Sequence, residues 1–112
     1  MPNQQTSLDR VFHALSDPTR MAVLDRLSHG PAPVGELAHD FDMALPSFMQ
    51  HLRVLENNGL VSSSKAGRVR TYQMQPEKLV AAMSWLEKRR LHWEQRLDQL
   101  DTYLATMKAE EQ

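Results

Sequence analysis

Cysteine is absent from all 112 residues of the sequence. Its absence excludes disulfide bonds, thiolate metal sites and cysteine nucleophiles, so any metal ion would need histidine and carboxylate ligands. Long apolar runs are absent too, because no stretch reaches the roughly 18 apolar residues that a membrane-spanning helix requires. The polar residues 1–5 lead into no apolar segment of a signal peptide. We therefore expect a cytoplasmic protein without membrane contact.

Motifs of catalysis are also missing. The sequence has no glycine-rich phosphate loop, no His-Glu-x-x-His and no Gly-x-Ser-x-Gly. Its carboxylates do not pair in an apolar setting. No metal-ligand spacing connects four of the histidines, which are His13, His29, His39 and His92. We expect neither an enzyme nor a bound metal or other cofactor.

The composition is typical of one globular domain, which we place at residues 1–112, with 41% hydrophobic and 24% charged residues. The formal net charge of −1 argues against a surface built for polyanions. However, residues 45–75 carry four basic residues and one acidic residue, whereas both flanking segments are acidic on balance. A local positive charge is expected where a protein meets phosphate, although an ordinary solvated face explains it equally well.

A helix is predicted for residues 45–56 by apolar residues at helical spacing. Pro46 is suited to its first turn, and Gly59 is suited to its C-terminal stop. The spacing gives one apolar stripe that can be buried, formed by Leu45, Phe48, Leu52 and Leu55. The other side of the helix remains free to contact a ligand.

Three shorter helices are predicted before this one. Residues 6–15 form an amphipathic helix, and Asp17 caps a second helix that begins at Pro18 and ends before residues 30–33. Residues 34–41 allow a third helix of only two turns, which a short connector joins to the helix just described. Two short helices joined by a tight turn predict a helix-turn-helix at about residues 34–58.

A β-hairpin is predicted after Gly59, because two short runs rich in Val, Ser, Thr and Tyr flank a turn that contains glycine. Tyr72 is expected to close its base. Three cations lie at its tip and flank and are candidates for phosphate contact: Lys65, Arg68 and Arg70. The sequence therefore predicts a mainly α protein with a small β-hairpin, a winged helix-turn-helix whose wing spans about residues 60–75.

A long final helix is predicted for residues 76–110, beginning at Pro76. At 1.5 Å per residue it would be roughly 50 Å long, too long for so small a domain to cover. A heptad seam with one polar interruption at Arg90 runs along it: Leu79, Met83, Leu86, Arg90, Trp93, Leu97, Leu100, Leu104 and Met107. We expect its first half to pack internally and the rest to dimerise, beside an acidic strip of Glu94, Asp98 and Asp101.

Five motifs occur in order: Asp17-Pro18-Thr19-Arg20, Val34-x-Glu36-Leu37-Ala38, Pro46-x-x-x-x-His51-Leu52-x-x-Leu55, Gly59-Leu60-Val61 and Gly67-Arg68-x-Arg70-x-Tyr72. Together they resemble the ArsR family of bacterial winged-helix repressors over about residues 8–76. The resemblance implies a homodimeric transcriptional repressor that pairs through its first and last helices and binds an inverted repeat in double-stranded DNA. The expected dimer interface comprises Leu8, Val11, Phe12, Leu86, Trp93, Leu97, Leu100 and Leu104.

The sequence departs from the family at its sensor and recognition positions. Many members sense metals through a Cys-x-Cys pair, and the matching positions hold Ala38 and Asp40. Other members place histidine and carboxylate ligands on the last helix, where His92 stands without a second histidine. A Ser-His pair common in the family is replaced by Met49-Gln50.

Four residues of the candidate recognition helix are expected to contact DNA, each with a structural alternative. Gln50 is suited to adenine, and Arg53 to phosphate or guanine unless it forms an ordinary ion pair. Ser47 either contacts DNA or caps the helix, and Met49 packs either on a thymine methyl group or against the hairpin. For His51 we expect a packed, hydrogen-bonded role first and a backbone contact second.

Two other functions are considered beside repression. The seam from Leu79 to Met107 could bind a helix of another protein, which would make the chain an interaction module. Alternatively, a repressor could carry a site for a small ligand or a histidine-bound metal near Trp85, Trp93 and the first helix. No effector is assigned.

Overall fold

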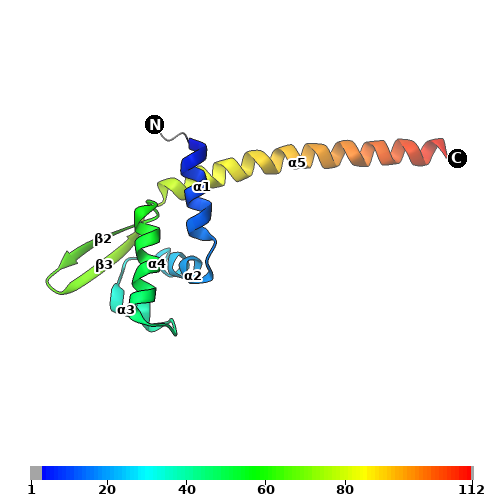
Figure 1. Ribbon diagram of the computed structural model, residues 1–112. Helices are drawn as coiled ribbons and strands as arrows, with labels where there is room; N and C mark the ends of the chain where they lie inside the picture. Colours follow the sequence, from blue (N-terminus) through cyan, green and yellow to red (C-terminus); the bar gives the residue numbers. More distant parts are fainter. Residues whose placement is uncertain (1–3, 112) are drawn as a thin grey trace. The chain divides into compact units, whose positions relative to one another are not determined.

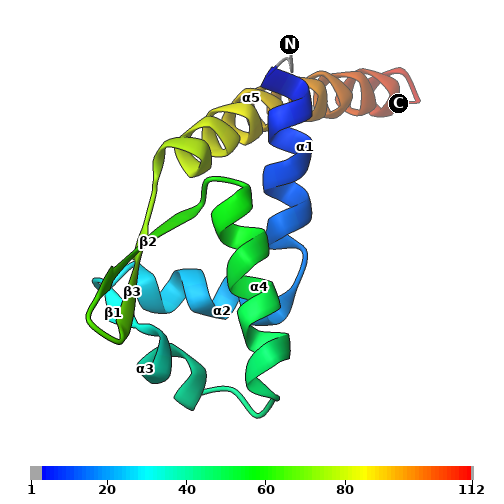
Figure 2. The same cartoon turned by 60° about the vertical axis from the view of Figure 1, so that its left-hand side comes forward.

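The computed structural model describes residues 4–111, with side chains from residue 8 onward, and is drawn in Figures 1 and 2. The chain contains two compact units, the first ending at Ala82 and the second beginning at Met83. The elements are α1 (Gln4–Leu15), α2 (Pro18–Leu27), β1 (Ala32–Pro33), α3 (Val34–His39), α4 (Leu45–Asn57), β2 (Val61–Ala66), β3 (Val69–Met74) and α5 (Glu77–Glu110). The expected class, mainly helical with a small sheet and a long final helix, is confirmed.

Helix α2 begins as its sequence predicts. Asp17 is the N-cap in an extended conformation, and its carboxylate accepts a hydrogen bond of 3.1 Å from the backbone N–H of Arg20. Pro18 occupies the first turn of α2. Backbone N–H groups have no intrahelical acceptor there, so the missing N–H of proline costs no hydrogen bond. The cap and the proline together fix where the chain turns from α1 into α2.

Helix α4 places three of its four predicted stripe residues in the core of the first unit. Phe48, Leu52 and Leu55 are buried, and the Phe48 ring packs on Phe41 with centroids 5.1 Å apart. Leu45 is a correction, because it is 56% exposed. It belongs to the first turn of the helix, which extends past the core.

A Schellman motif ends α4 and directs the chain into the hairpin. Gly59 has φ +75, the backbone N–H of Leu60 donates to the carbonyl of Leu55, and the N–H of Gly59 donates to that of Glu56. Leu60 and Leu55 both lie in the core. The predicted stop at Gly59 is confirmed.

The sheet contains a strand that the sequence did not reveal. β2 and β3 form the expected antiparallel hairpin, with Ala66 opposite Val69 and Gly67 at φ +63 in the two-residue turn. On the other side of β3, Ala32 of β1 pairs with Tyr72, giving the order β1-β3-β2. The segment 30–33, expected only to end a helix, therefore also supplies an edge strand, where proline is tolerated.

Helix α5 spans 34 residues, as the heptad pattern predicts. Ala82 is buried in the first unit, and Leu79 packs partly against its core. From Met83 to Glu110 the helix makes up the second unit, in which every apolar residue but Trp85 is exposed. No helix within residues 4–111 is both long and apolar enough to cross a membrane.

Leu52→Ala is expected to lower the free energy of unfolding by about 2–5 kcal/mol, because Leu52 is fully buried and its truncation leaves a cavity. Leu45→Ala is the matched control, being the same change in the same helix at an exposed position, and it should cost less than about 0.5 kcal/mol. Urea denaturation at one fixed protein concentration measures both. Equal losses would contradict the assigned rotation of α4.

Candidate nucleic-acid interface

The face of α4 opposite its buried stripe is polar and exposed. Ser47, Gln50 and Arg53 lie on it at a spacing of three residues, close to one helical turn. Arg53 donates a hydrogen bond of 2.8 Å from Nη2 to Oε1 of Gln50. The pair presents guanidinium N–H groups and an amide together, which is a set of donors suited to base edges and phosphates.

Ser47 and Met49 differ in their surroundings. The N-cap of α4 is Ala44, which makes no side-chain capping bond, so Ser47 is not the cap and its side chain is exposed. Met49 is partly buried and packs against the core, which favours a structural role for its thioether, whereas its packing on the hairpin stays a prediction. Gln50, not Met49, is therefore the more accessible of these neighbouring residues.

Arg20 anchors α4 to the preceding helices, a role that the sequence did not reveal. Its side chain is buried, and its Nε donates to the carbonyl of Ala14 at 2.6 Å. Its Nη2 donates to the carbonyl of His13 at 3.3 Å, and its Nη1 lies 3.1 Å from Nδ1 of His51. One guanidinium thus joins the end of α1 to the middle of α4.

His51 has the structural role that we expected first. Arginine is only a donor, so Nδ1 of His51 accepts the bond from Arg20 and the imidazole proton resides on Nε2. The same Nδ1 lies 3.7 Å from Oδ2 of Asp17. His51 therefore belongs to a polar cluster behind the exposed face of α4.

The pKa of Asp17 in this cluster is lowered. Burial alone would raise the pKa, but the hydrogen bonds from the backbone N–H groups of Arg20 and Thr19 and the charge of the Arg20 guanidinium outweigh it. Because the ionised carboxylate is the form that caps α2, the cap is strongest when Asp17 is charged.

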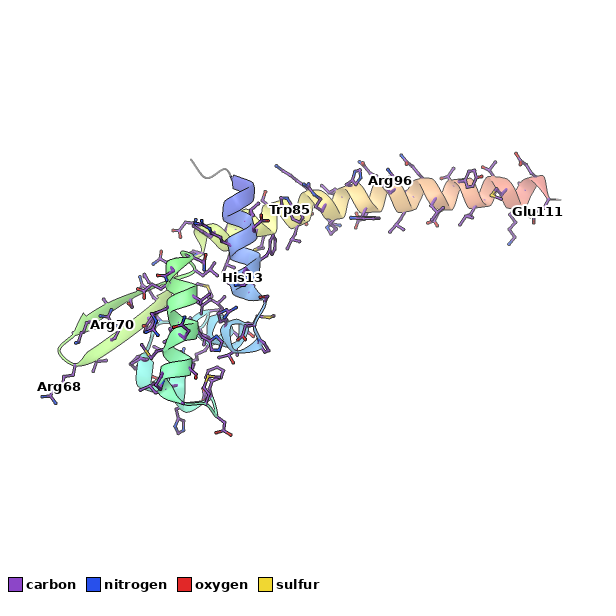
Figure 3. All side chains as sticks on the ribbon, viewed as in Figure 1. His13, Arg68, Arg70, Trp85, Arg96 and Glu111 are labelled. Atoms are coloured by element: carbon purple, nitrogen blue, oxygen red, sulfur yellow. The ribbon has the colours of Figure 1, made fainter. Side chains whose placement is uncertain are left out.

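The three cations of the hairpin are not equivalent. Lys65 and Arg68 are exposed, and Figure 3 shows Arg68 at the tip of the ribbon. Arg70 is half-buried and donates from Nη1 to Oγ of Ser63 at 2.9 Å, and Ser63 donates to Oε2 of Glu56 at 2.8 Å. Arg70 thus links the hairpin to the end of α4, whereas Lys65 and Arg68 remain available to a ligand.

Tyr72 closes the base of the hairpin, as expected, and is 2% exposed. Burial raises the pKa of its hydroxyl, and the carboxylate of Glu56 raises it further. The phenol is therefore neutral at physiological pH and acts as a packed element of the core.

The predicted dimer interface divides into two groups. In α1, Leu8 and Phe12 pack partly against the core, but Val11 is 1% exposed, and its expected place in an interface is wrong because the chain buries it. The five predicted residues of α5 are all exposed in the single chain: Leu86, Trp93, Leu97, Leu100 and Leu104. The structure offers these side chains to a partner without showing one.

Ligand groups for a metal do not gather in the described part of the chain. Among the residues searched, no three histidine, aspartate or glutamate residues are placed to hold an ion. Trp93 is 64% exposed, and the ring of Trp85 lies 4.4 Å from the guanidinium carbon of Arg89.

A helix-turn-helix formed by α3 and α4, followed by a projecting basic hairpin, defines a winged helix-turn-helix protein (Figures 1 and 3). A family model described as a helix-turn-helix domain matches residues 15–63. The chain belongs to the ArsR family of transcriptional regulators.

Known relatives support this assignment. The chain is 45% identical over 82 residues to the HTH-type transcriptional regulator Rv2034 of Mycobacterium tuberculosis, covering 73% of this chain and 77% of the relative. It is 32% identical to the transcriptional repressor SdpR of Bacillus subtilis, covering 70% and 88%. The crystal structure of the ArsR family regulator RHA00566 matches with a TM-score of 0.77 and 50% identity, covering 84% and 97%.

Asp17→Asn should lower the free energy of unfolding at neutral pH and lose that effect in acid. The folded-state pKa of Asp17 is lowered, so its carboxylate stabilises the fold above the unfolded pKa of about 3.9, and the contribution is lost as the pH falls through the folded pKa. Asn can still cap, whereas Asp17→Ala should cost about 1 kcal/mol at neutral pH.

Denaturation of the wild type and both variants between pH 3 and 7 measures this dependence. Asp25→Asn, at an exposed carboxylate of the same helix, is the control for a general loss of charge. A difference between wild type and Asp17→Asn that grows as the pH falls would contradict the role assigned to Asp17.

Proposed function

We propose that the protein is a sequence-specific DNA-binding repressor that acts as a homodimer on an inverted-repeat operator. The observation that supports this proposal most directly is the exposed polar face of α4, on which Ser47, Gln50 and Arg53 are turned away from the core. In this proposal α4 is the recognition helix and lies in the major groove, and Lys65 and Arg68 of the hairpin bind phosphates. A cytoplasmic location follows, because the operator would lie there.

The two kinds of contact have different consequences for binding. Phosphate contacts supply affinity and its salt dependence, whereas contacts to base edges supply sequence preference. In a symmetric dimer, two recognition helices about 34 Å apart would meet half-sites one helical turn apart or a multiple of it. The relatives named above are regulators and one is a repressor, which supports repression as the outcome of binding.

Gel-shift titration of the protein on its own upstream DNA tests the proposal directly. We expect binding to this duplex to be at least about a thousandfold tighter than binding to random duplex of equal length at physiological salt. Equal affinity for the two duplexes would refute sequence-specific repression.

Arg68→Ala should weaken binding to all duplexes by a similar factor. The slope of log Kd against log salt concentration should fall by about one for each phosphate that the variant no longer neutralises, because fewer counterions are then released. Lys88→Ala, which removes a cation from α5, is the matched control and should leave the slope unchanged. An unchanged slope in Arg68→Ala would remove the hairpin tip from the DNA interface.

Gln50→Ala should instead alter sequence preference. We expect a loss of about 1–3 kcal/mol per half-site on the operator and little change on random duplex. Gln99→Ala, the same substitution on α5, is the control. Selection of bound sequences from a random pool compares the variants, and an unchanged preference in Gln50→Ala would refute base contact by this side chain.

A further inference from the structure

The outer half of the hairpin is exposed, whereas its base packs in the core. Tyr72 at the base is buried, and every residue of 64–69 is exposed on a ribbon that projects from the helices (Figure 1). Two antiparallel strands on their own are at best marginally stable in water, so the outer half gains little rigidity from itself. A further contact is therefore needed if Lys65 and Arg68 are to meet phosphates at defined places.

Three side chains form a hydrogen-bonded relay from the hairpin to the end of α4. Nη1 of Arg70 donates to Oγ of Ser63 at 2.9 Å, and that Oγ donates to Oε2 of Glu56 at 2.8 Å. A hydroxyl has one proton to donate and two lone pairs, so Ser63 serves both partners in one direction, from guanidinium to carboxylate. Hydrogen bonds to charged groups are stronger than neutral ones, and successive bonds polarise one another. The relay is therefore a directional link between the hairpin and the helix.

The strand register explains why Ser63 is the serine that reaches α4. Ser63 lies opposite Tyr72, and Arg70 precedes Tyr72 by two residues on the same strand. Because residues two apart share a face of the sheet, Ser63 and Arg70 meet on the face that Tyr72 buries against the core. Ser64, the next residue of β2, is on the other face and is exposed. It offers a matched position outside the relay.

We propose that Glu56, Ser63 and Arg70 are positioning residues that hold the hairpin at a fixed angle to α4. The cations of the hairpin tip then meet phosphates while α4 lies in the major groove. This inference rests on the proposed function and specifies what joins its two contact surfaces. A hairpin that is already ordered loses less conformational entropy when DNA binds. The hydroxyl of Ser63 thus acts on DNA only through the position of Lys65 and Arg68.

Ser63 is the member of the relay whose substitution separates position from charge. Replacing Arg70 or Glu56 would change the net charge beside DNA and alter binding by electrostatics alone. Ser63→Ala breaks the relay and leaves every cation of the hairpin in place. Arg70 and Glu56 are only half-buried, so both can turn to water, and the fold should persist. Ser63→Thr keeps the hydroxyl on a residue type suited to strands, and Ser64→Ala is the matched control.

Binding to the protein's own upstream duplex over a range of salt concentrations tests this role. Ser63→Ala should raise Kd roughly 2- to 12-fold per half-site, because the hairpin must then be ordered on binding. The slope of log Kd against log salt concentration should fall by about one to two per half-site, although no charge has been removed, because Lys65 and Arg68 no longer meet fixed phosphates. Ser63→Thr should restore both values, and Ser64→Ala should leave both unchanged.

A double-mutant cycle checks that Ser63 acts through the hairpin tip. Arg68→Ala should weaken binding by a smaller factor in the Ser63→Ala background than in the wild type, because a mobile tip has less contact to lose. In the Ser64→Ala background the factor should equal that of the wild type. Equal factors in all three backgrounds would overturn the positioning role.

NMR relaxation of the backbone amides in the full chain measures the mobility of the hairpin without DNA. Order parameters of residues 65–68 should be lower in Ser63→Ala than in the wild type and in Ser64→Ala, moving toward the roughly 0.6 of flexible segments. Equal order parameters in these proteins would overturn the positioning role independently of any binding result.

The outcomes separate this inference from the proposed function. A wild type that prefers its upstream duplex, with an unchanged salt slope in Ser63→Ala, overturns the positioning role and leaves repression standing. Tighter binding or a steeper slope in Ser63→Ala also overturns it, because Arg70 would then be a phosphate contact that Ser63 holds back. A wild type that binds upstream and random duplex equally overturns the proposed function and the inference that rests on it.

Discussion

Burial of one side of α4 is the constraint on which the rest of the first unit depends. Phe48, Leu52 and Leu55 are buried in the core of this unit, where α4 packs against α2 and β2, and their positions fix the rotation of the helix about its axis. Because successive residues are about 100° apart, that rotation also decides which residues face solvent. Exposure of Gln50 and Arg53 is therefore a consequence of core packing, and any rotation that hid them would bring polar groups into the core.

The guanidinium of Arg20 adds a second constraint to this apolar packing, because its hydrogen bonds require particular directions between donors and acceptors. Its acceptors include the carbonyls of His13 and Ala14, which lie at the end of α1, where helical carbonyls lack intrahelical partners. A cation there also interacts favourably with the negative end of the helix dipole. A buried charge is costly unless it is fully hydrogen-bonded, and the bond with His51 extends the network to α4. Packing thus sets the rotation of α4, and this network ties the helix to α1.

The sequence predicts those features that depend on neighbours along the chain. The Asp17 cap and the stop at Gly59 each follow from a local pattern, and each is observed. The strand at Ala32 was missed because two residues show no periodicity, and only pairing with β3 makes them a strand. The same distinction applies to the candidate site. Arginine is a residue type suited to phosphate contact, yet the guanidinium of Arg70 donates its hydrogen bond to Ser63 on the neighbouring strand. Side-chain type identifies candidates, whereas the fold decides which of them remain available to DNA.

In the proposed function, recognition and pairing occupy different parts of the chain, and this separation has a physical basis. The polar face of α4 and the hairpin tip need exposed donors, which interact with a hydrated polyanion and gain affinity as counterions are released. Pairing along the seam of α5 would instead need apolar area that is removed from water. A long helix with little tertiary packing is only marginally stable alone, so pairing along the seam would also stabilise the helix itself. Under this proposal, substitutions in the apolar seam of α5 act on assembly, and substitutions on α4 act on recognition, through forces that respond differently to salt.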